Sequence, residues 1–382
     1  MRVALVHDWL TGVRGGERVL DVMAGAFPDA EIFTLLHVRG STTPRLESRP
    51  IHTSPLDRLP GKARHYRKWL PLFPWAIRRL ELPPVDLVLS SSHAVAKSVR
   101  VPPGALHLCY CHTPMRYAWD QVDAYLGRGL RRAAARPLIS ALRAFDVRHS
   151  GPDQIHRFLA NSTTVARRIF DAYGREARVL PPPVDLERFR PSGEKPGSEY
   201  LLVSGFVPYK ADALAIEAFA ASGKPLVVAG DGPLRRRIEG SAPPNVRFVG
   251  RVSDDTLARL YADCRALIHP QVEDFGLIAV EAQACGRPVI ALGRGGAIDS
   301  VRPLGGDAAA TGVLFDEQTP TALNRAVERF EASEESFDSA AIRRHAEHFG
   351  RERFVAALRE EADDLVTKHL RPKSVRELEP RR

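Results

Sequence analysis

Short β-branched runs alternate with helical stretches along the whole chain. Residues 2–7 form the first run, and a glycine loop separates it from residues 16–27, where apolar positions recur at helical spacing. Near-continuous apolar strands separated by helices are typical of a parallel sheet covered on both faces. The pattern therefore predicts an α/β domain. Its strands in the first half of the chain are expected at residues 2–7, 85–90, 105–111 and 157–162.

Three consecutive prolines at 181–183 end this series, and a polar stretch follows before a second series begins at residue 200. We predict a hinge there, between two doubly wound domains that face each other across a cleft. The predicted domains are residues 1–183 and 184–349, a helix over about 350–370 could pack back onto the first, and 371–382 form a charged tail. Strands of the second domain are expected at 200–205, 224–230, 245–250, 265–270, 287–292 and 312–315.

Composition supports a folded, two-domain protein. A chain of 382 residues exceeds the usual span of one hydrophobic core, and 44% apolar with 26% charged residues are ordinary globular values. Four scattered cysteines are too few for a disulfide framework at this size, so we expect buried thiols in a reducing compartment. We find neither an apolar run of membrane-spanning length nor a secretory signal, and we expect a cytoplasmic location.

The chain is basic, with a formal charge of +9, which calls for an acidic partner such as nucleic acid, an anionic lipid surface or a phosphorylated small molecule. Residues 58–79 interleave basic with aromatic side chains, a mixture typical of a segment at an anionic membrane surface. A solvated face whose aromatic rings pack inward is the alternative. The candidate membrane and acceptor residues are Arg67, Lys68, Trp69, Arg78 and Arg79.

Two glycine-containing loops could approach phosphate groups. Gly15 and Gly16 lie between the first strand and its helix, where N–H groups at the helix N-terminus can meet an anion, although a plain tight turn explains them equally well. Lys210 follows another strand at the start of the next helix, a position suited to a diphosphate, or else it is a surface lysine. Residues 229–233 are interpreted as a strand-to-helix turn.

Glu273 and Glu281 flank a glycine that is expected to begin a helix. Glu273 would lie in the loop and Glu281 along the helix, where one can address a reacting sugar and the other a ribose. N–H groups at residues 275–277 would meet an anion between them. A bare pair of glutamates is usually solvated surface, but the glycine, the preceding strand and the following R-P-V-I strand favour a site.

A metal site is an alternative interpretation for four possible ligands within six residues, although burial of alternate positions on a strand explains them without a metal. The four are His107, Cys109, Cys111 and His112. Asp254 and Asp255 follow Ser253 at a predicted helix start, where helix capping accounts for them.

Together these elements resemble the retaining glycosyltransferases of family 4, which have the GT-B fold of two Rossmann-like domains. The resemblance covers nearly the whole chain and is most specific from V-P-Y-K (207–210) to R-P-V-I-A (287–291). In the first domain, residues 7–20 and 110–120 look most like the branch of bacterial O-antigen mannosyltransferases. The resemblance implies mannosyl transfer from GDP-mannose or another nucleotide-sugar onto a lipid-linked or polysaccharide acceptor.

The resemblance also implies roles for individual residues. Gly15 and Gly16 would approach the donor phosphates, His112 would contact the transferred sugar, Lys210 would neutralise the leaving diphosphate, and Glu273 would hold sugar hydroxyls. The other donor-binding positions implied are the N–H groups of Phe275, Gly276 and Leu277 for sugar or phosphate, Glu281 for the ribose, and the backbone around Arg251 and Val252 for the base.

One position departs from the family pattern. Many members carry an arginine five residues before the lysine, and this chain has Gly205 there, so the charge is missing or comes from elsewhere, with Arg14 and Arg116 as candidates. No cofactor or metal is implied, nor nucleic acid as a partner, and the enzyme is expected at the inner face of the cytoplasmic membrane. A related transferase using a UDP-sugar and a non-catalytic polyanion-binding protein with this fold are the alternatives.

Overall fold

The computed structural model describes residues 1–119, 130–207 and 210–370, which form two compact units. The first unit comprises Met1–Leu180 together with the chain from Phe354 onwards, and the second comprises Pro181–Arg353. The division falls at the start of the proline run where the sequence predicts a hinge. The charged tail predicted at 371–382 lies outside the described residues.

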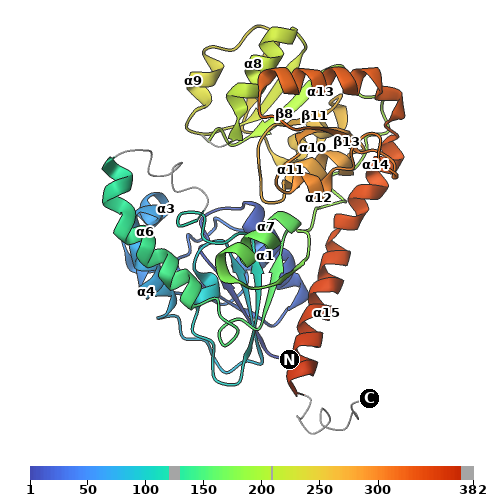
Figure 1. The fold of residues 1–382 in the computed structure, drawn as a ribbon. Helices are drawn as coiled ribbons and strands as arrows, with labels where there is room; N and C mark the ends of the chain where they lie inside the picture. Colours follow the sequence, from blue (N-terminus) through green and yellow to red (C-terminus); the bar gives the residue numbers. More distant parts are fainter. Residues whose placement is uncertain (120–129, 208–209, 371–382) are drawn as a thin grey trace, which may run out of the picture. The chain divides into compact units, whose positions relative to one another are not determined.

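A parallel sheet forms the centre of the first unit (Figure 1). Its order among the described residues is β3-β2-β1-β4-β5-β6-β7, so the chain reverses its direction of winding between β1 and β4. The strands are β1 (Val3–His7), β2 (Glu31–Thr34), β3 (Ile51–Thr53), β4 (Leu87–Ser92), β5 (Leu106–Cys111), β6 (Arg157–Ala160) and β7 (Ala177–Val179).

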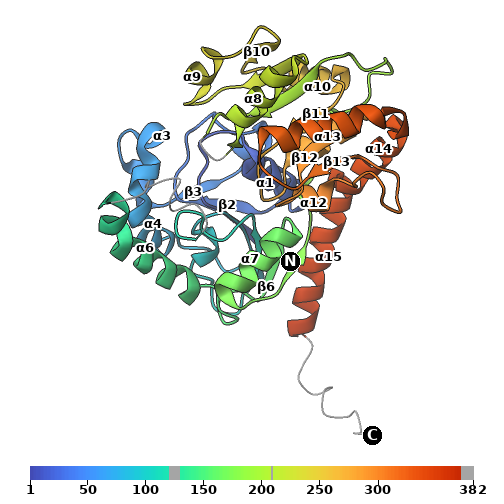
Figure 2. The same ribbon diagram turned by 45° about the horizontal axis from the view of Figure 1, so that its top comes forward.

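Helices and 3₁₀ turns cover both faces of this sheet, as the turned view in Figure 2 also shows. They are α1 (Gly15–Ala26), α2 (Pro44–Glu47), η1 (Pro55–Arg58), α3 (Lys62–His65), η2 (Tyr66–Leu72), α4 (Phe73–Ile77), η3 (Ala96–Ser98), α6 (Leu130–Arg148), α7 (Thr163–Tyr173) and the greater part of α15 (Arg351–Leu370).

The second unit repeats the plan with a parallel sheet of order β10-β9-β8-β11-β12-β13, again within the described residues. Its strands are β8 (Tyr200–Ser204), β9 (Leu226–Gly230), β10 (Val246–Gly250), β11 (Leu267–His269), β12 (Val289–Leu292) and β13 (Gly312–Phe315). Its helical elements are α8 (Asp212–Ser222), α9 (Arg235–Glu239), α10 (Asp254–Asp263), α11 (Leu277–Ala284), α12 (Ala297–Ser300), α13 (Pro320–Ala332), η5 (Glu334–Ser336), α14 (Ser339–Ala346) and η6 (Glu347–Phe349).

The predicted α/β fold with two doubly wound domains is confirmed, and every strand expected from the sequence is present with bounds that differ by one or two residues. The sequence analysis missed β2, β3 and β7. These three strands are short and lie toward the edges of the first sheet, where the apolar run that marks a doubly covered strand is weakest. All four cysteines are buried free thiols, as predicted.

Burial of alternate strand residues builds a core on each face of the first sheet. Leu5 and Tyr110 contribute to one core, whereas Val6 and Val88 contribute to the other. Phe354 and Leu358 of α15 join the first of these cores, and Arg157 holds the helix with ion pairs to Glu361 (2.6 Å) and Asp364 (2.8 Å). The last helix therefore packs on the first unit although it follows the second in sequence.

Among the described residues, every helix is too short or too polar to span a bilayer.

A buried carboxylate organises the carboxyl end of the first sheet. Asp8, which is 0% exposed, follows β1 and accepts hydrogen bonds from four successive backbone N–H groups, those of residues 93–96, at 2.6 to 2.9 Å. Burial by itself raises the pKa of Asp8, but the charges of His93 and His7 and the N–H groups outweigh that effect and hold it below its usual value. This carboxylate fixes the loop that leaves β4.

A second buried charge anchors the same loop to α6 and α7. Lys97 is 0% exposed and pairs with Asp146, and its ammonium group also donates to the carbonyl of Ala94 at 3.1 Å. Asp146 in turn accepts from Trp119 at 2.8 Å and from Tyr173 at 2.6 Å. Because both buried charges are paired and hydrogen-bonded, the network tolerates its burial.

Replacement of Asp8 by Asn is expected to lower the free energy of unfolding by about 3 kcal/mol, because the amide can accept only part of these hydrogen bonds and its NH₂ group faces other donors. Urea unfolding at pH 7 measures the change. Asp29→Asn, an exposed position in the same unit, is the matched control.

The effect should also depend on pH. The folded pKa of Asp8 lies below that of the unfolded chain, so its stabilisation is present above the unfolded pKa of about 3.9 and is lost as the pH falls through the folded value. The difference between wild type and Asp8→Asn should therefore shrink on acidification, and a difference that grows would contradict this assignment.

Candidate functional site

Ligands of doubly wound sheets bind outside the carboxyl ends of the strands, at the point where the winding reverses. In the second unit this point lies between β8 and β11, and in the first between β1 and β4. The residues that the sequence analysis selected follow these strands or their neighbours. Each unit therefore carries one candidate site.

An ion pair marks the switch point of the second unit. Lys210 precedes α8, and its Nζ lies 3.1 Å from Oε1 of Glu273, in the loop between β11 and α11. Each side chain is 21% exposed, so both remain accessible to a ligand. The structure thus brings together two of the three residues predicted to be catalytic, and the pair offers a cation beside a hydrogen-bond acceptor.

Beneath this pair lies a buried histidine that the sequence analysis missed. His269 ends β11 and is 0% exposed, and neither ring nitrogen has a hydrogen-bond partner among the described residues. Burial is the main cause that lowers its pKa, and Lys210 lowers it further while Glu273 opposes the change. A Cβ on Gly276 would lie 3.1 Å from Nε2 of His269. The only sequence signal is a polar residue at the end of an apolar strand.

Gly276 shapes the loop because it adopts φ +83°, a conformation that favours glycine, and caps α11. Phe275 is buried and Leu277 opens the helix. In the first turn of α11, the N–H of Ala279 donates to Gly276 O at 3.0 Å. That the N–H groups of residues 275–277 meet an anion stays a prediction. The loop is also held from behind, because a Cβ on Gly296 would lie 2.1 Å from Cα of Phe275 and the N–H of Gly296 donates to Glu273 O at 2.9 Å.

Gly295 and Gly296 are thus structural supports of the Glu273 loop that the sequence analysis did not select. Their signal was present as an adjacent glycine pair that two residues separate from the end of the strand β12. The glycines of 229–233 have a similar task, since a Cβ on Gly230 would lie 1.8 Å from Ser204 O and one on Gly232 would lie 2.0 Å from Gly205 O. That segment is a strand-to-helix turn, as predicted.

Glu281 lies within α11, and its Oε2 accepts a hydrogen bond from the hydroxyl of Tyr261 at 3.0 Å. Burial and the Glu281 carboxylate raise the pKa of Tyr261 well above its usual range, so the phenol stays protonated and donates. The bond orients this carboxylate, and its predicted contact with ribose hydroxyls stays a prediction.

Arg251 and Val252, the predicted contacts to the base, follow β10 in the segment that leads to α10. Arg251 is exposed and Val252 is partly buried against the core. The hydroxyl of Ser253 accepts from the N–H of Thr256 at 3.2 Å, which confirms the predicted helix cap. Asp254 pairs with Arg188 at 2.9 Å.

Three histidines lie close together in the candidate site of the first unit, namely His7, His93 and His112. Ser91 of β4 lies beside His7 of β1, and its Oγ is 3.1 Å from His7 Nδ1 and 2.8 Å from His112 Nε2. His93 follows the same strand and pairs with Asp8 at 3.1 Å. A Cβ on Gly16 would lie 3.6 Å from the ring of His7 and 3.9 Å from that of His112.

The structure therefore places His112 and the Gly15–Gly16 turn next to each other, as neighbouring parts of one site. Burial lowers the pKa of His112 well below its usual value, and the charges of His93, His7 and Arg116 lower it further while Asp8 opposes them. Burial likewise lowers the pKa of His7. Both imidazoles are neutral near pH 7, which suits acceptance of a hydrogen bond from a sugar hydroxyl.

His107 and the two neighbouring cysteines have a different setting. Nε2 of His107 lies 2.8 Å from Ser90 Oγ and its Nδ1 lies 3.0 Å from Gln154 O, so both nitrogens are engaged by protein groups. Cys109 and Cys111 pack in an apolar cluster with Phe158. Within the described ranges, no group of three or more His, Cys, Asp and Glu side chains has an arrangement that could hold a metal ion.

The basic and aromatic segment spans η2 and α4. Arg67, Lys68 and Arg79 are exposed, whereas Arg78 is half-buried and donates to the carbonyl of Ser98 at 3.2 Å. Trp69 packs partly against the core. The segment also exposes large apolar side chains, with Leu72 at 45% and Trp75 at 48%.

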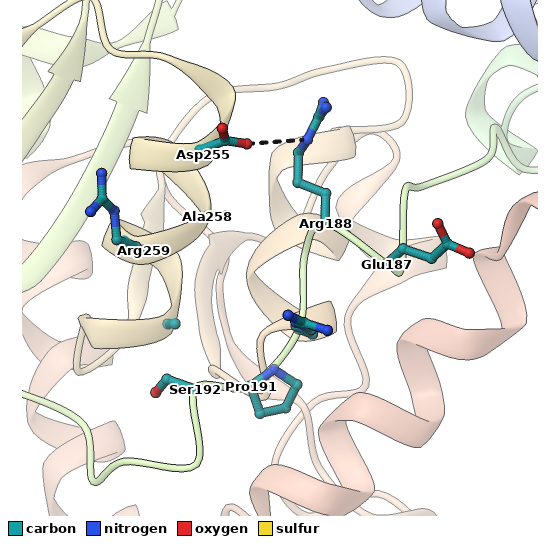
Figure 3. Close-up of a pocket in the computed structure, with 9 residues that line it drawn as sticks. Glu187, Arg188, Pro191, Ser192, Asp255, Ala258 and Arg259 are labelled. Carbon is teal, nitrogen blue, oxygen red and sulfur yellow. Dashed lines mark ion pairs between the residues drawn. The ribbon is translucent and has the colours of Figure 1, made fainter.

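A separate pocket of about 440 Å³ lies between α10 and the 187–192 segment of the second unit (Figure 3). Arg188 points toward Asp255 there, and their nearest charged atoms are 3.7 Å apart. None of the predicted site residues lines this pocket, so we do not assign the candidate site to it.

Comparison with known proteins bears on the second unit most directly. Residues 185–348 match the family model described as glycosyl transferases group 1. The chain is 32% identical over 241 residues to a D-inositol 3-phosphate glycosyltransferase of Geodermatophilus obscurus, an alignment covering 53% of this chain and 51% of that protein. A protein of the same name from Salinispora tropica is 30% identical over 254 residues, covering 56% and 52%. The chain thus spans about half the length of the curated relatives it matches.

Solved structures match over nearly the whole chain. Anabaena Alr3699/HepE in complex with UDP has a TM-score of 0.69 at 17% identity, covering 95% of this chain and 100% of that one. Sucrose-phosphate synthase from Thermosynechococcus elongatus has a TM-score of 0.70 at 19% identity, covering 96% and 100%. These similarities confirm the predicted GT-B fold.

Proposed function

We propose that this protein is a retaining glycosyltransferase that moves a hexose, with mannose from GDP-mannose as the first candidate, onto a lipid-linked or polysaccharide acceptor without a metal ion. One observation carries the proposal. The Lys210–Glu273 pair lies at the switch point of the second unit, inside the segment that matches glycosyl transferases group 1.

The chemistry needs what this site offers. Departure of a nucleoside diphosphate leaves an oxocarbenium-like sugar and places negative charge on the leaving oxygens. Lys210 and the first-turn N–H groups of α11 would stabilise those oxygens, and Glu273 would hold sugar hydroxyls. His112 of the other unit would contact the transferred sugar. Nζ of Lys210 and Oε1 of Glu273 lie 3.1 Å apart, so the two groups could address neighbouring parts of one donor.

The donor base has two candidates. GDP-mannose is supported by the likeness of residues 7–20 and 110–120 to O-antigen mannosyltransferases, although residue 120 lies outside the described residues. A UDP-sugar is supported by the solved relative whose structure contains UDP-glucose. The acceptor panel should include inositol phosphate, because the curated relatives carry that name.

Replacement of Lys210 by Ala is expected to lower kcat/KM for donor hydrolysis by about 100-fold, since it removes the cation proposed for the leaving diphosphate. Nucleotide release from GDP-mannose, GDP-glucose, UDP-glucose and ADP-glucose measures this without an acceptor. Lys195→Ala, an exposed lysine of the same unit, is the control. Release that persists unchanged in Lys210→Ala, or that stops on chelation and returns with Mg²⁺, would contradict the mechanism.

Restoring the family arginine at position 205 provides a second prediction. A Cβ on Gly205 would meet nothing within 4 Å, and its φ is not in the left-handed region, so a side chain fits there. Gly205→Arg should bind GDP or UDP about fivefold more tightly by calorimetry, because a second cation joins Lys210. Gly205→Gln, of similar length without charge, is the control. Equal affinity in both variants would mean that the diphosphate does not reach this position and would favour the polyanion-binding alternative.

We further propose that the η2–α4 segment contacts an anionic membrane. Its support is the exposure of Leu72 and Trp75 next to Arg67, Lys68 and Arg79. The proposal excludes Arg78, whose guanidinium group binds carbonyls within the unit.

Charge reversal of Arg67, Lys68 and Arg79 to Glu should weaken binding to vesicles containing phosphatidylglycerol by at least about tenfold, since each basic group near such a surface contributes about 1 kcal/mol. Cosedimentation measures it. Reversal of three exposed arginines of the second unit, Arg236, Arg237 and Arg259, is the control. Equal loss in both triple variants would show that only net charge matters.

A further inference from the structure

The hydroxyl group of Ser91 bridges two histidines of the first unit. Its Oγ lies 3.1 Å from Nδ1 of His7 and 2.8 Å from Nε2 of His112. Parallel pairing of β1 with β4 places His7 opposite Ser91, and the N–H of His112 donates to Ser92 O at 2.8 Å, so the backbone fixes all three side chains. The bridge is therefore a built feature of the sheet edge.

Counting protons shows that the bridge couples the two rings. A serine hydroxyl donates one hydrogen bond, and each neutral imidazole carries one N–H and one bare nitrogen. Ser91 cannot donate to both rings, so at least one histidine donates to Oγ. When His7 Nδ1 is the acceptor, His112 must present Nε2–H to the serine, and Nδ1 of His112 is then bare.

His7 has a second nitrogen that no described residue engages. Nε2 of His7 belongs to a 0% exposed side chain and lacks a hydrogen-bond partner among the described residues. It lies 4.0 Å from the Cβ position of Gly16, the second residue of the 12-residue helix α1. The first-turn N–H groups of α1 carry the positive end of the helix dipole. A buried polar atom without a partner beside such a terminus indicates a ligand, and the dipole indicates an anion.

We propose that His7 is a positioning residue that donates a hydrogen bond to an anionic phosphate group at the Gly15–Gly16 turn. Through Ser91, His7 then sets the tautomer of His112. An anionic phosphate oxygen can only accept a hydrogen bond, so phosphate places the proton of His7 on Nε2 and leaves Nδ1 to accept from Ser91. Ser91 then accepts from Nε2–H of His112, whose Nδ1 becomes a hydrogen-bond acceptor for a sugar hydroxyl. The last step rests on the proposed function, whereas the relay itself does not.

Charged and titratable neighbours face the relay from several elements. Glu17 of α1, Asp8 after β1, and His93 after β4 surround His7, and Arg116 together with His93 and Asp8 surrounds His112. Any of them could alter a pH profile, so the decisive measurement is the tautomer and not a titration.

Nitrogen NMR on the full chain with ¹⁵N-labelled histidine tests the relay directly. With inorganic diphosphate bound, His7 should show a protonated Nε2 and His112 a protonated Nε2 with bare Nδ1. Ser91→Ala should abolish the dependence of His112 on diphosphate while His7 still responds. Ser90→Ala is the matched control. Ser90 lies next to Ser91 on β4, and its hydroxyl group makes a hydrogen bond of 2.8 Å to His107, outside the relay.

Two substitutions of His7 separate its two contacts. His7→Asn keeps an amide near the Nδ1 position, next to Ser91, and should weaken diphosphate binding about tenfold with little change at His112. His7→Gln places an amide near the Nε2 position and should retain diphosphate affinity while the His112 tautomer no longer responds. In turnover, Ser91→Ala should lower kcat about tenfold with an unchanged KM for the donor.

The possible results separate the relay from the proposed function. A protonated Nδ1 on His112 with diphosphate bound, no diphosphate response at His7, or the same loss in Ser90→Ala as in Ser91→Ala would each overturn the relay. A coupled tautomer in a wild-type protein that releases no nucleotide from any sugar donor would leave the relay standing and overturn the glycosyltransferase proposal.

Discussion

The geometry of the candidate site in the first unit depends on the hydrogen bonds that the carboxylate of Asp8 accepts. Four backbone N–H groups of the loop after β4 donate to it, and three of them belong to residues that are 0% exposed. Because that loop directly follows Ser91 and Ser92, the strand end that holds the two histidines cannot shift without breaking several buried hydrogen bonds. A single acidic residue after β1 thus holds the connection that follows β4 in one conformation.

In the second unit, a different kind of contact holds the candidate site in place. Its loops are held by close contact between backbones, since Gly230, Gly232 and Gly296 each touch a neighbouring loop where even a methyl group would overlap. The loops that carry Lys210 and Glu273 are therefore positioned by close backbone contacts, which only residues without a side chain allow. Gly205 differs from these glycines, because open space surrounds it. The charge at that position is free to vary without cost to the fold.

The sequence predicted the architecture well because strands covered on both faces must be apolar throughout, and β4, β5 or β12 are unmistakable in that respect. It also selected Lys210 and Glu273, which the structure brings together, and His112, because their residue types stand out after strands. It could not find His7, Ser91 or His269. These residues act through contacts between strands or with a loop far along the chain, and a polar residue at the end of an apolar run reveals nothing about its neighbour until the strand order is known.

The path of α15 has a consequence for how the chain is made. The second unit is one continuous segment, whereas the first is completed only by residues from Phe354 onwards. On the ribosome the chain emerges from its N-terminus, so one face of the core around Leu5 and Tyr110 stays uncovered until α15 has been made. The unit that is made later is thus the first whose residues are all available to complete its core.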